Sequence, residues 1–136
     1  MASTGEKKVK QWLKRKLKKD FPDCWIYLAP GGKFGRIGVP DLILCVHGLF
    51  ISIEAKAFPG LELTKNQKHE SGLILKAGGL ASSMKGKDEV KYNAIVSAIR
   101  SRIEVKLRIS KDNKNNKSEG GSDSGDDREA VSADGS

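Results

Sequence analysis

The sequence of 136 residues has few of the residues that build metal clusters, disulfide frameworks or membrane spans. Its two cysteines, Cys24 and Cys45, form no C-x-x-C pair, and its two histidines, His47 and His69, stand in unrelated positions. This argues against a zinc cluster and favours reduced thiols in apolar segments. No apolar run approaches about 20 residues, and the first residues lack the apolar stretch of a signal peptide. We therefore expect a soluble, intracellular and cytoplasmic protein that does not span a membrane.

Positive charge dominates most of the chain. Residues 1–110 hold 21 Lys and Arg against 10 Asp and Glu, whereas residues 111–136 hold 4 against 7. A basic body favours polyanions, because neutralising phosphates releases condensed counterions from nucleic acid. A soluble surface whose lysines only face water is the alternative. Because residues 111–136 offer almost nothing to bury, we predict one domain over residues 1–110 and a disordered polar tail over residues 111–136.

Hydrophobic periodicity predicts a single α/β domain. The expected helices cover residues 6–19, 64–77 and 88–102, and the expected strands cover 25–28, 41–47, 49–57 and 80–84. Inward-facing positions are Val9, Trp12, Leu13 and Leu17 in the first helix and Val90, Ala94, Ile95, Ala98 and Ile99 in the last. Residues 105–109 form a short strand or extend the last helix. The order of elements indicates a mixed central sheet flanked by helices.

The glycine-rich loop between the first two strands, residues 30–38, carries Lys33 and Arg36. It lacks the spacing of a P-loop. Its glycines either allow the backbone to approach a phosphate closely or simply form a flexible connection.

Three ionisable residues are expected to meet at one end of an otherwise apolar hairpin. Asp41 begins one strand, and Glu54 and Lys56 share a face of the next because they are two residues apart. Counting outward from a turn at Gly48 places Asp41 opposite Ala55.

Burying Asp41 and Glu54 together costs several kcal/mol unless a cation compensates them, and Lys56 neutralises only one of the two. A divalent metal such as Mg²⁺ or Mn²⁺ is the natural second partner for hard oxygen ligands open to phosphate. Lys56 would then hold or activate the attacking water and offset charge in the transition state. A structural ion pair between strands is the alternative.

Two further residues lie where a site would use them. Glu6 falls on the apolar side of the first helix, although an acidic residue in a first turn also interacts favourably with the helix dipole. Gln67 opens the second helix, where the run Thr64-Lys65-Asn66-Gln67 also fits a capping box. Function and capping both remain open for Gln67.

These motifs resemble the PD-(D/E)XK nuclease superfamily, and most closely its VRR-NUC branch in a stand-alone, phage-type form. Members of that branch combine a glutamate on an early helix, a G-I/V-P-D-L strand, an E-x-K strand, a small-residue turn and a glutamine at a helix start. The matching positions are Glu6, Gly38 to Leu42, Glu54 to Lys56, Pro59-Gly60 and Gln67. The late Val-Arg-Arg-like strand of the family is replaced by Ala81-Ser82-Ser83-Met84-Lys85, where only the basic Lys85 matches.

The resemblance implies a restriction-endonuclease-like fold and a metal-dependent endodeoxyribonuclease. It implies Asp41, Glu54 and the backbone carbonyl of Ala55 as metal ligands and Lys56 as the catalytic lysine. It also implies that Glu6 is a further ligand or orients one, and that Gln67 belongs to the active site.

Structure-selective cutting of branched DNA is expected, because cations on a small body contact phosphates and do not read bases. The cations named for this contact are Lys7, Lys10, Lys14, Lys33, Arg36 and Lys85. By resemblance, the chain is expected to resolve Holliday junctions as a homodimer. The alternatives are a flap or single-strand nuclease of the same fold, a non-catalytic DNA-binding protein, and a module that binds a protein partner.

Overall fold

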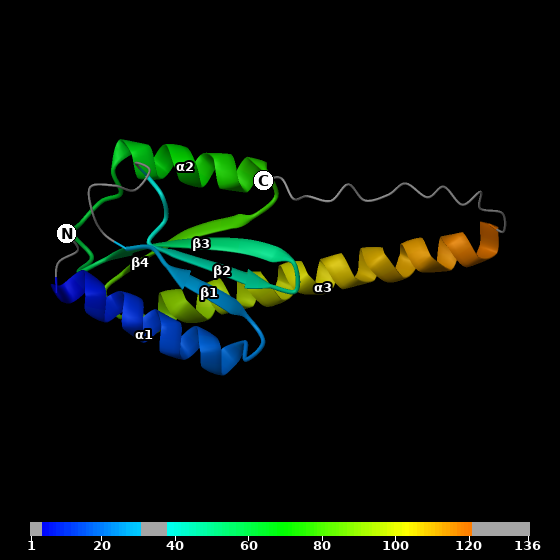
Figure 1. Cartoon of the computed structure of the whole chain (residues 1–136), viewed down its shortest axis with the longest axis horizontal. Coiled ribbons are helices and arrows are strands. Elements are labelled where there is room, and N and C mark those ends of the chain that lie inside the picture. Colours follow the sequence, from blue (N-terminus) through cyan, green and yellow to red (C-terminus); the bar gives the residue numbers. More distant parts are fainter. Residues whose placement is uncertain (1–3, 31–37, 121–136) are drawn as a thin grey trace. The chain divides into compact units, whose positions relative to one another are not determined.

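The computed structural model describes residues 4–30 and 38–120, with side chains up to residue 116. Within these ranges, helices and strands follow one another in the predicted order (Figure 1). The elements are α1 (Thr4–Asp20), β1 (Trp25–Leu28), β2 (Leu42–Val46), β3 (Leu49–Lys56), α2 (Lys65–Lys76), β4 (Leu80–Lys85) and α3 (Glu89–Gly120).

The four strands form one mixed sheet in the order β1-β2-β3-β4. β1, β2 and β3 are antiparallel neighbours, whereas β3 and β4 run parallel with α2 as their crossover. Figure 1 shows α2 on one face of the sheet and α1 on the other. The predicted α/β domain with a mixed sheet flanked by helices is confirmed.

The hydrophobic core lies between the sheet and the helices α1 and α3. Alternate residues of β2 and β3 are buried there, because facing partners such as Leu42 and Ile53 share a face. From α1, Val9, Leu13 and Leu17 fill the core as predicted, and Trp12 is half-buried against it. The opposite face of the sheet carries Glu54 and Lys56.

The hairpin between β2 and β3 differs by one residue from the predicted register. Val46 pairs with Leu49, so the turn consists of His47 and Gly48, both with positive φ (48° and 79°). Such two-residue turns match the twist of the flanking strands. One step beyond the last pair, Leu42 with Ile53, Asp41 therefore lies opposite Glu54 and not opposite Ala55 as predicted.

The inward face of α3 is narrower than predicted. Ile95 and Ile99 are buried, but Val90, Ala94 and Ala98 are exposed, with 81% of Val90 accessible. Tyr92 and Val96 fill the core in their place. The buried stripe is therefore rotated about the helix axis from the predicted one, and Tyr92 can bury its ring because its hydroxyl donates to Asp20 Oδ2 at 2.5 Å.

The last helix is also longer than predicted. Residues 105–109 extend α3, which continues through Gly120 and so reaches into the stretch predicted as a polar tail. Lengthening an existing helix costs little, and an ion pair of 2.8 Å between Glu104 and Arg108 supports this stretch. The first compact unit of the chain ends at Ile103, before the predicted boundary at residue 110. The rest of the predicted tail, residues 121–136, lies outside the described residues.

Both cysteines are free, in agreement with the expected thiols, although Cys45 is only partly buried. In the part of the chain that the structure describes, no helix is long and apolar enough to cross a membrane.

Candidate active site

Glu54 is a buried carboxylate on the face of the sheet that α2 covers. Its side chain is 1% exposed. Oε2 accepts a hydrogen bond of 3.1 Å from Gln67 Nε2, whereas Oε1 has no hydrogen-bond partner among the described residues. An unpaired carboxylate oxygen in a buried position is costly, so this atom calls for a proton or a cation.

Asp41 holds the ends of three strands together. Its Oδ2 accepts the backbone N–H of Ala55 at 2.9 Å, and its carbonyl accepts the N–H of Ala29 at 2.9 Å. The first bond ties Asp41 to β3 beside Glu54, and the second ties it to the end of β1. The carboxyl groups of Asp41 and Glu54 are thereby fixed next to each other, as the sequence predicted.

Burial raises the pKa of Glu54 to about 8, and the charge of Asp41 beside it acts in the same direction. The Asp41 side chain, which lies within hydrogen-bonding reach if the two groups share a proton, raises it further, whereas the nearby Lys56 ammonium and the Asp41 backbone lower it. Two ionised carboxylates cannot donate to each other, so the pair at neutral pH holds either a proton or a cation.

Glu6 and Lys10 bring α1 to this cluster. Burial raises the pKa of Glu6, and the charge of Asp41 adds to the effect, while Lys56 and Lys10 lower it. Glu6 therefore senses the same charges as Glu54, which agrees with its predicted inward position. Lys10, one turn further along α1, is only 7% exposed, and its Nζ donates to the carbonyl of Ala29 at 3.5 Å.

Gln67 serves two partners at once through the two ends of its amide. Its Oε1 accepts the N–H of Thr64 at 2.9 Å, and Thr64 Oγ1 accepts the N–H of Gln67 at 3.1 Å, which completes a capping box. Its Nε2 simultaneously donates to Glu54. Because the backbone N–H of Thr64 can only donate, it fixes the side-chain oxygen of Gln67 on its side, and Gln67 Nε2 therefore faces the Glu54 carboxylate. Capping and contact with the site are thus compatible in a single conformation.

The backbone conformation and close packing at residue 38 explain why the Gly38-Val39-Pro40-Asp41 run begins with glycine. Its φ is +85°, and a Cβ atom there would lie 2.9 Å from the carbonyl oxygen of Asn66 and 2.9 Å from Glu70 Cγ. Only glycine allows the chain before Asp41 to pass this close to the first turn of α2. The chain that leads to Asp41 thus passes directly against the turn of α2 that carries Gln67.

No family model and no curated protein matches the chain by sequence. Among solved structures, one described as a "VRR_NUC domain" superposes with a TM-score of 0.58 and 18% sequence identity. The match covers 70% of this chain and 97% of that domain. This chain has the VRR-NUC fold. The fold implied by the motifs at Asp41 and at Glu54 to Lys56 is therefore confirmed, whereas the roles of individual residues stay predictions.

The predicted phosphate-binding cations occupy different environments on this VRR-NUC fold. Lys7 and Lys14 are exposed on α1, and Lys85 pairs with Lys56 in the sheet register and donates to Glu62 at 3.3 Å. Lys33 and Arg36 lie outside the described residues. Lys10 is buried instead, with its ammonium toward the end of β1, and its predicted contact with phosphate stays a prediction. Its spacing of four residues from Glu6 was the signal that the two share a face.

The two central carboxylates of the cluster fit a divalent metal. Among residues 4–30 and 38–120, no three His, Cys, Asp or Glu side chains are grouped as a ready metal cage. Asp41 and Glu54 provide hard oxygen donors, and Glu54 Oε1 is a buried oxygen that lacks a partner. The residues present are thus suited to a divalent metal that prefers oxygen ligands.

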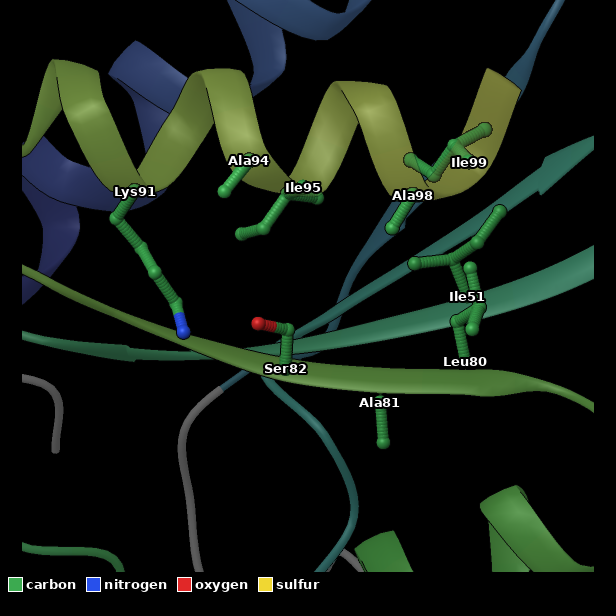
Figure 2. A pocket seen from close by; sticks show the side chains of 9 residues that line it. All are labelled: Ile51, Leu80, Ala81, Ser82, Lys91, Ala94, Ile95, Ala98 and Ile99. Atoms are coloured by element: carbon green, nitrogen blue, oxygen red, sulfur yellow. The ribbon is translucent and has the colours of Figure 1, made fainter. Parts of the chain in front are cut away.

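The pocket drawn in Figure 2 lies on the opposite face of the sheet from Glu54. It has a volume of about 230 Å³, and its lining is mostly apolar. Ser82 and Lys91 point into it, whereas Ala81 points away from α3, toward the face that carries Glu54. Because residues of β4 alternate between the two faces, this pocket does not open into the candidate site.

Proposed function

We propose that this chain is a metal-dependent DNA endonuclease of the VRR-NUC family, which hydrolyses phosphodiester bonds. The observation that carries the proposal is the buried Glu54 carboxylate, beside Asp41 and with one oxygen unpartnered, on a VRR-NUC fold. A structural ion pair would satisfy both oxygens, because an unpaired buried acceptor brings no stability. A carboxylate oxygen without a hydrogen-bond partner, next to a second carboxylate, is instead suited to bind a cation that arrives with the substrate.

Each residue of the cluster has a role in this proposal. Asp41, Glu54 and the carbonyl of Ala55 would hold Mg²⁺ or Mn²⁺. When bound, the ion polarises the phosphate and neutralises charge that develops in the transition state. Lys56, on the same face as Glu54, orients the attacking water and stabilises negative charge on the phosphate oxygens.

Glu6 and Gln67 act on these groups from the two flanking helices. Gln67 fixes the rotamer of Glu54 through its Nε2. Glu6 is a further ligand or orients one, and its charge acts on the cluster from the first turn of α1. Both residues are placed by regular helices, which hold side chains more precisely than loops do.

Branched DNA is the proposed substrate. The exposed Lys7 and Lys14, together with Lys85, would neutralise phosphates, and phosphate contacts position a duplex without reading its bases. A homodimer that resolves four-way junctions through paired cuts is the form that the sequence resemblance favours. Flap or single-strand cleavage by the same site is the alternative.

The test is cleavage of labelled four-way junction, flap, duplex and single-stranded DNA with Mg²⁺, with Mn²⁺ and with EDTA. Glu54→Gln is compared with Glu89→Gln, which removes an exposed carboxylate paired with Lys16 at 2.6 Å, away from the site. We expect metal-dependent cutting by the wild type and by Glu89→Gln, and none by Glu54→Gln. If salt-sensitive DNA binding persists but no substrate is cut under any condition, the chain is a non-catalytic DNA-binding protein.

A further inference from the structure

Three aromatic side chains are exposed on the sheet, and we call Trp25, Tyr27 and Phe50 the aromatic face. Their exposed fractions are 59%, 43% and 41%. The rings of Trp25 and Tyr27 are parallel, with an interplanar angle of 3° and centroids 6.0 Å apart. Exposed apolar patches of about this size are often functional.

The strand register places the aromatic face on the same side of the sheet as Glu54. Tyr27 pairs with Ile43, which pairs with Ser52, and Ser52 is two residues before Glu54. Facing partners and alternate residues share a face, so all of these side chains point the same way. Phe50 joins them because it is two residues before Ser52.

The distance from this face to the candidate site corresponds to a few nucleotides. From strand spacing and rise, the Cα atoms of Tyr27 and Trp25 lie about 12 and about 16 Å from that of Glu54. A stacked DNA strand advances about 3.4 Å per nucleotide. A strand cut at Glu54 would therefore bring nucleotides about four or five positions away onto the rings.

The size of the face favours nucleotides over a second copy of the chain. A fully buried aromatic residue contributes about 150–250 Å², so three that are about half exposed offer roughly 300 Å². A stable protein interface needs about 800 Å² from each partner. Two or three bases, in contrast, need only ring faces of this size.

We propose that the aromatic face of Trp25, Tyr27 and Phe50 stacks on unpaired bases of the DNA strand that enters the site at Glu54. This inference rests on the proposed nuclease function. Bases within a duplex already stack on each other and do not offer their faces to a protein. The substrate therefore carries a single-stranded segment beside the cut, which favours flaps and single-stranded extensions over a fully paired four-way junction.

The test measures binding in EDTA, so that it does not depend on cleavage. Fluorescence anisotropy compares a labelled duplex with the same duplex carrying a 5′ or a 3′ single-stranded extension. The double variant Trp25→Ala/Tyr27→Ala removes the stacked rings, and Trp25→Phe/Tyr27→Phe keeps rings in their place. Val90→Ser is the matched control, because it changes an exposed apolar side chain on α3, which packs on the other face of the sheet. Thermal melting confirms that each variant is folded.

We expect the double alanine variant to bind the duplex with either the 5′ or the 3′ extension about tenfold to a hundredfold more weakly than the wild type does. Its affinity for the blunt duplex should be unchanged. The double phenylalanine variant and Val90→Ser should bind as the wild type does. Bases that stack on Trp25 should also quench tryptophan fluorescence, and Trp25→Phe should abolish that quenching.

Two results would overturn this proposal. One is an equal loss, or no loss, of affinity for extended and blunt duplexes in the double alanine variant. The other is a change from dimer to monomer in the same variant, which would make the face an interface between copies. If the aromatic face proves necessary for binding extensions while no DNA is ever cut, the proposed nuclease function fails and the binding site stands.

Discussion

Replacing Glu54 with glutamine should stabilise the metal-free protein at neutral pH. The unfolded chain releases the Glu54 proton near the ordinary pKa of 4.5, whereas the folded protein retains it to about pH 8. Between these values the folded state binds more protons than the unfolded state, so the free energy of unfolding falls as pH rises. Glutamine has the shape of glutamate. Its amide oxygen can still accept the hydrogen bond from Gln67, and its amide nitrogen can donate to Asp41.

The size of the effect follows from the shift in pKa. At pH 7, ionising this carboxylate in the unfolded state but not in the folded state costs up to about 3 kcal/mol, since each unit is about 1.4 kcal/mol. An amide N–H donates to the Asp41 carboxylate less strongly than a carboxyl proton does, which offsets part of the gain. We expect Glu54→Gln to raise the free energy of unfolding by about 1–2 kcal/mol at pH 7, or the melting temperature by about 5–10 °C. At pH 4, where the carboxyl is protonated in the folded state, the two proteins should melt together.

The assay is thermal melting from pH 4 to pH 8 in EDTA, repeated with Mg²⁺. In EDTA the wild type should lose stability relative to Glu54→Gln as pH rises from about 4.5 to about 8. Mg²⁺ should then stabilise the wild type and leave the variant nearly unchanged, because a ligand that binds only the folded state raises its stability by mass action. A variant that is less stable than the wild type at pH 7 in EDTA would refute the reasoning about the buried pair. Equal responses to Mg²⁺ would mean that the ion binds elsewhere.

Five further substitutions, of which Thr64→Ala and Gly78→Ala are matched comparisons, test the surroundings of the site and the core. Gln67→Ala and Thr64→Ala should each cost about 1 kcal/mol through loss of the cap, but only Gln67→Ala should also slow cleavage, by about tenfold or more. Gly38→Ala should lower the free energy of unfolding by about 2 kcal/mol or more, and by more than Gly78→Ala, which has positive φ but open space around it. Tyr92→Phe removes a buried hydrogen bond and should cost about 1–2 kcal/mol in chemical denaturation while cleavage is unchanged. Equal cleavage rates for the Gln67 and Thr64 variants would contradict the assignment of Gln67.

The sheet and the order of the elements could be predicted because β2 and β3 are strongly apolar and bounded by turn residues. The shared face of Glu54 and Lys56 follows from the period of a strand alone, and the structure has it so. The partner opposite Asp41 could not be predicted, because it depends on whether the turn holds one residue or two. His47 adopts a positive φ, which is uncommon for residues other than glycine and could not be predicted from the residue type.

Tertiary packing decided the points that the sequence pattern missed. Lys10 reads as one more cation on a basic helix, and only its contact with the carbonyl of Ala29 shows that it lies inward. In α3 the apolar pattern also fits Val90, but the ring of Tyr92 occupies the core beside Trp12. Local periodicity identifies an apolar stripe, whereas its edges depend on which neighbours arrive from elsewhere in the chain.

Helix α2 has a consequence for the opening motions of the protein. None of its side chains, all within the described range, is fully buried, and its first turn is held by a capping box. Helices with so little buried surface exchange their amide protons through local openings that need far less free energy than global unfolding. Each such opening would carry Gln67 away from Glu54 and admit water to the carboxylate pair. Docking of α2 therefore completes the cluster, and a ligand that binds Glu54 should slow hydrogen exchange along this helix.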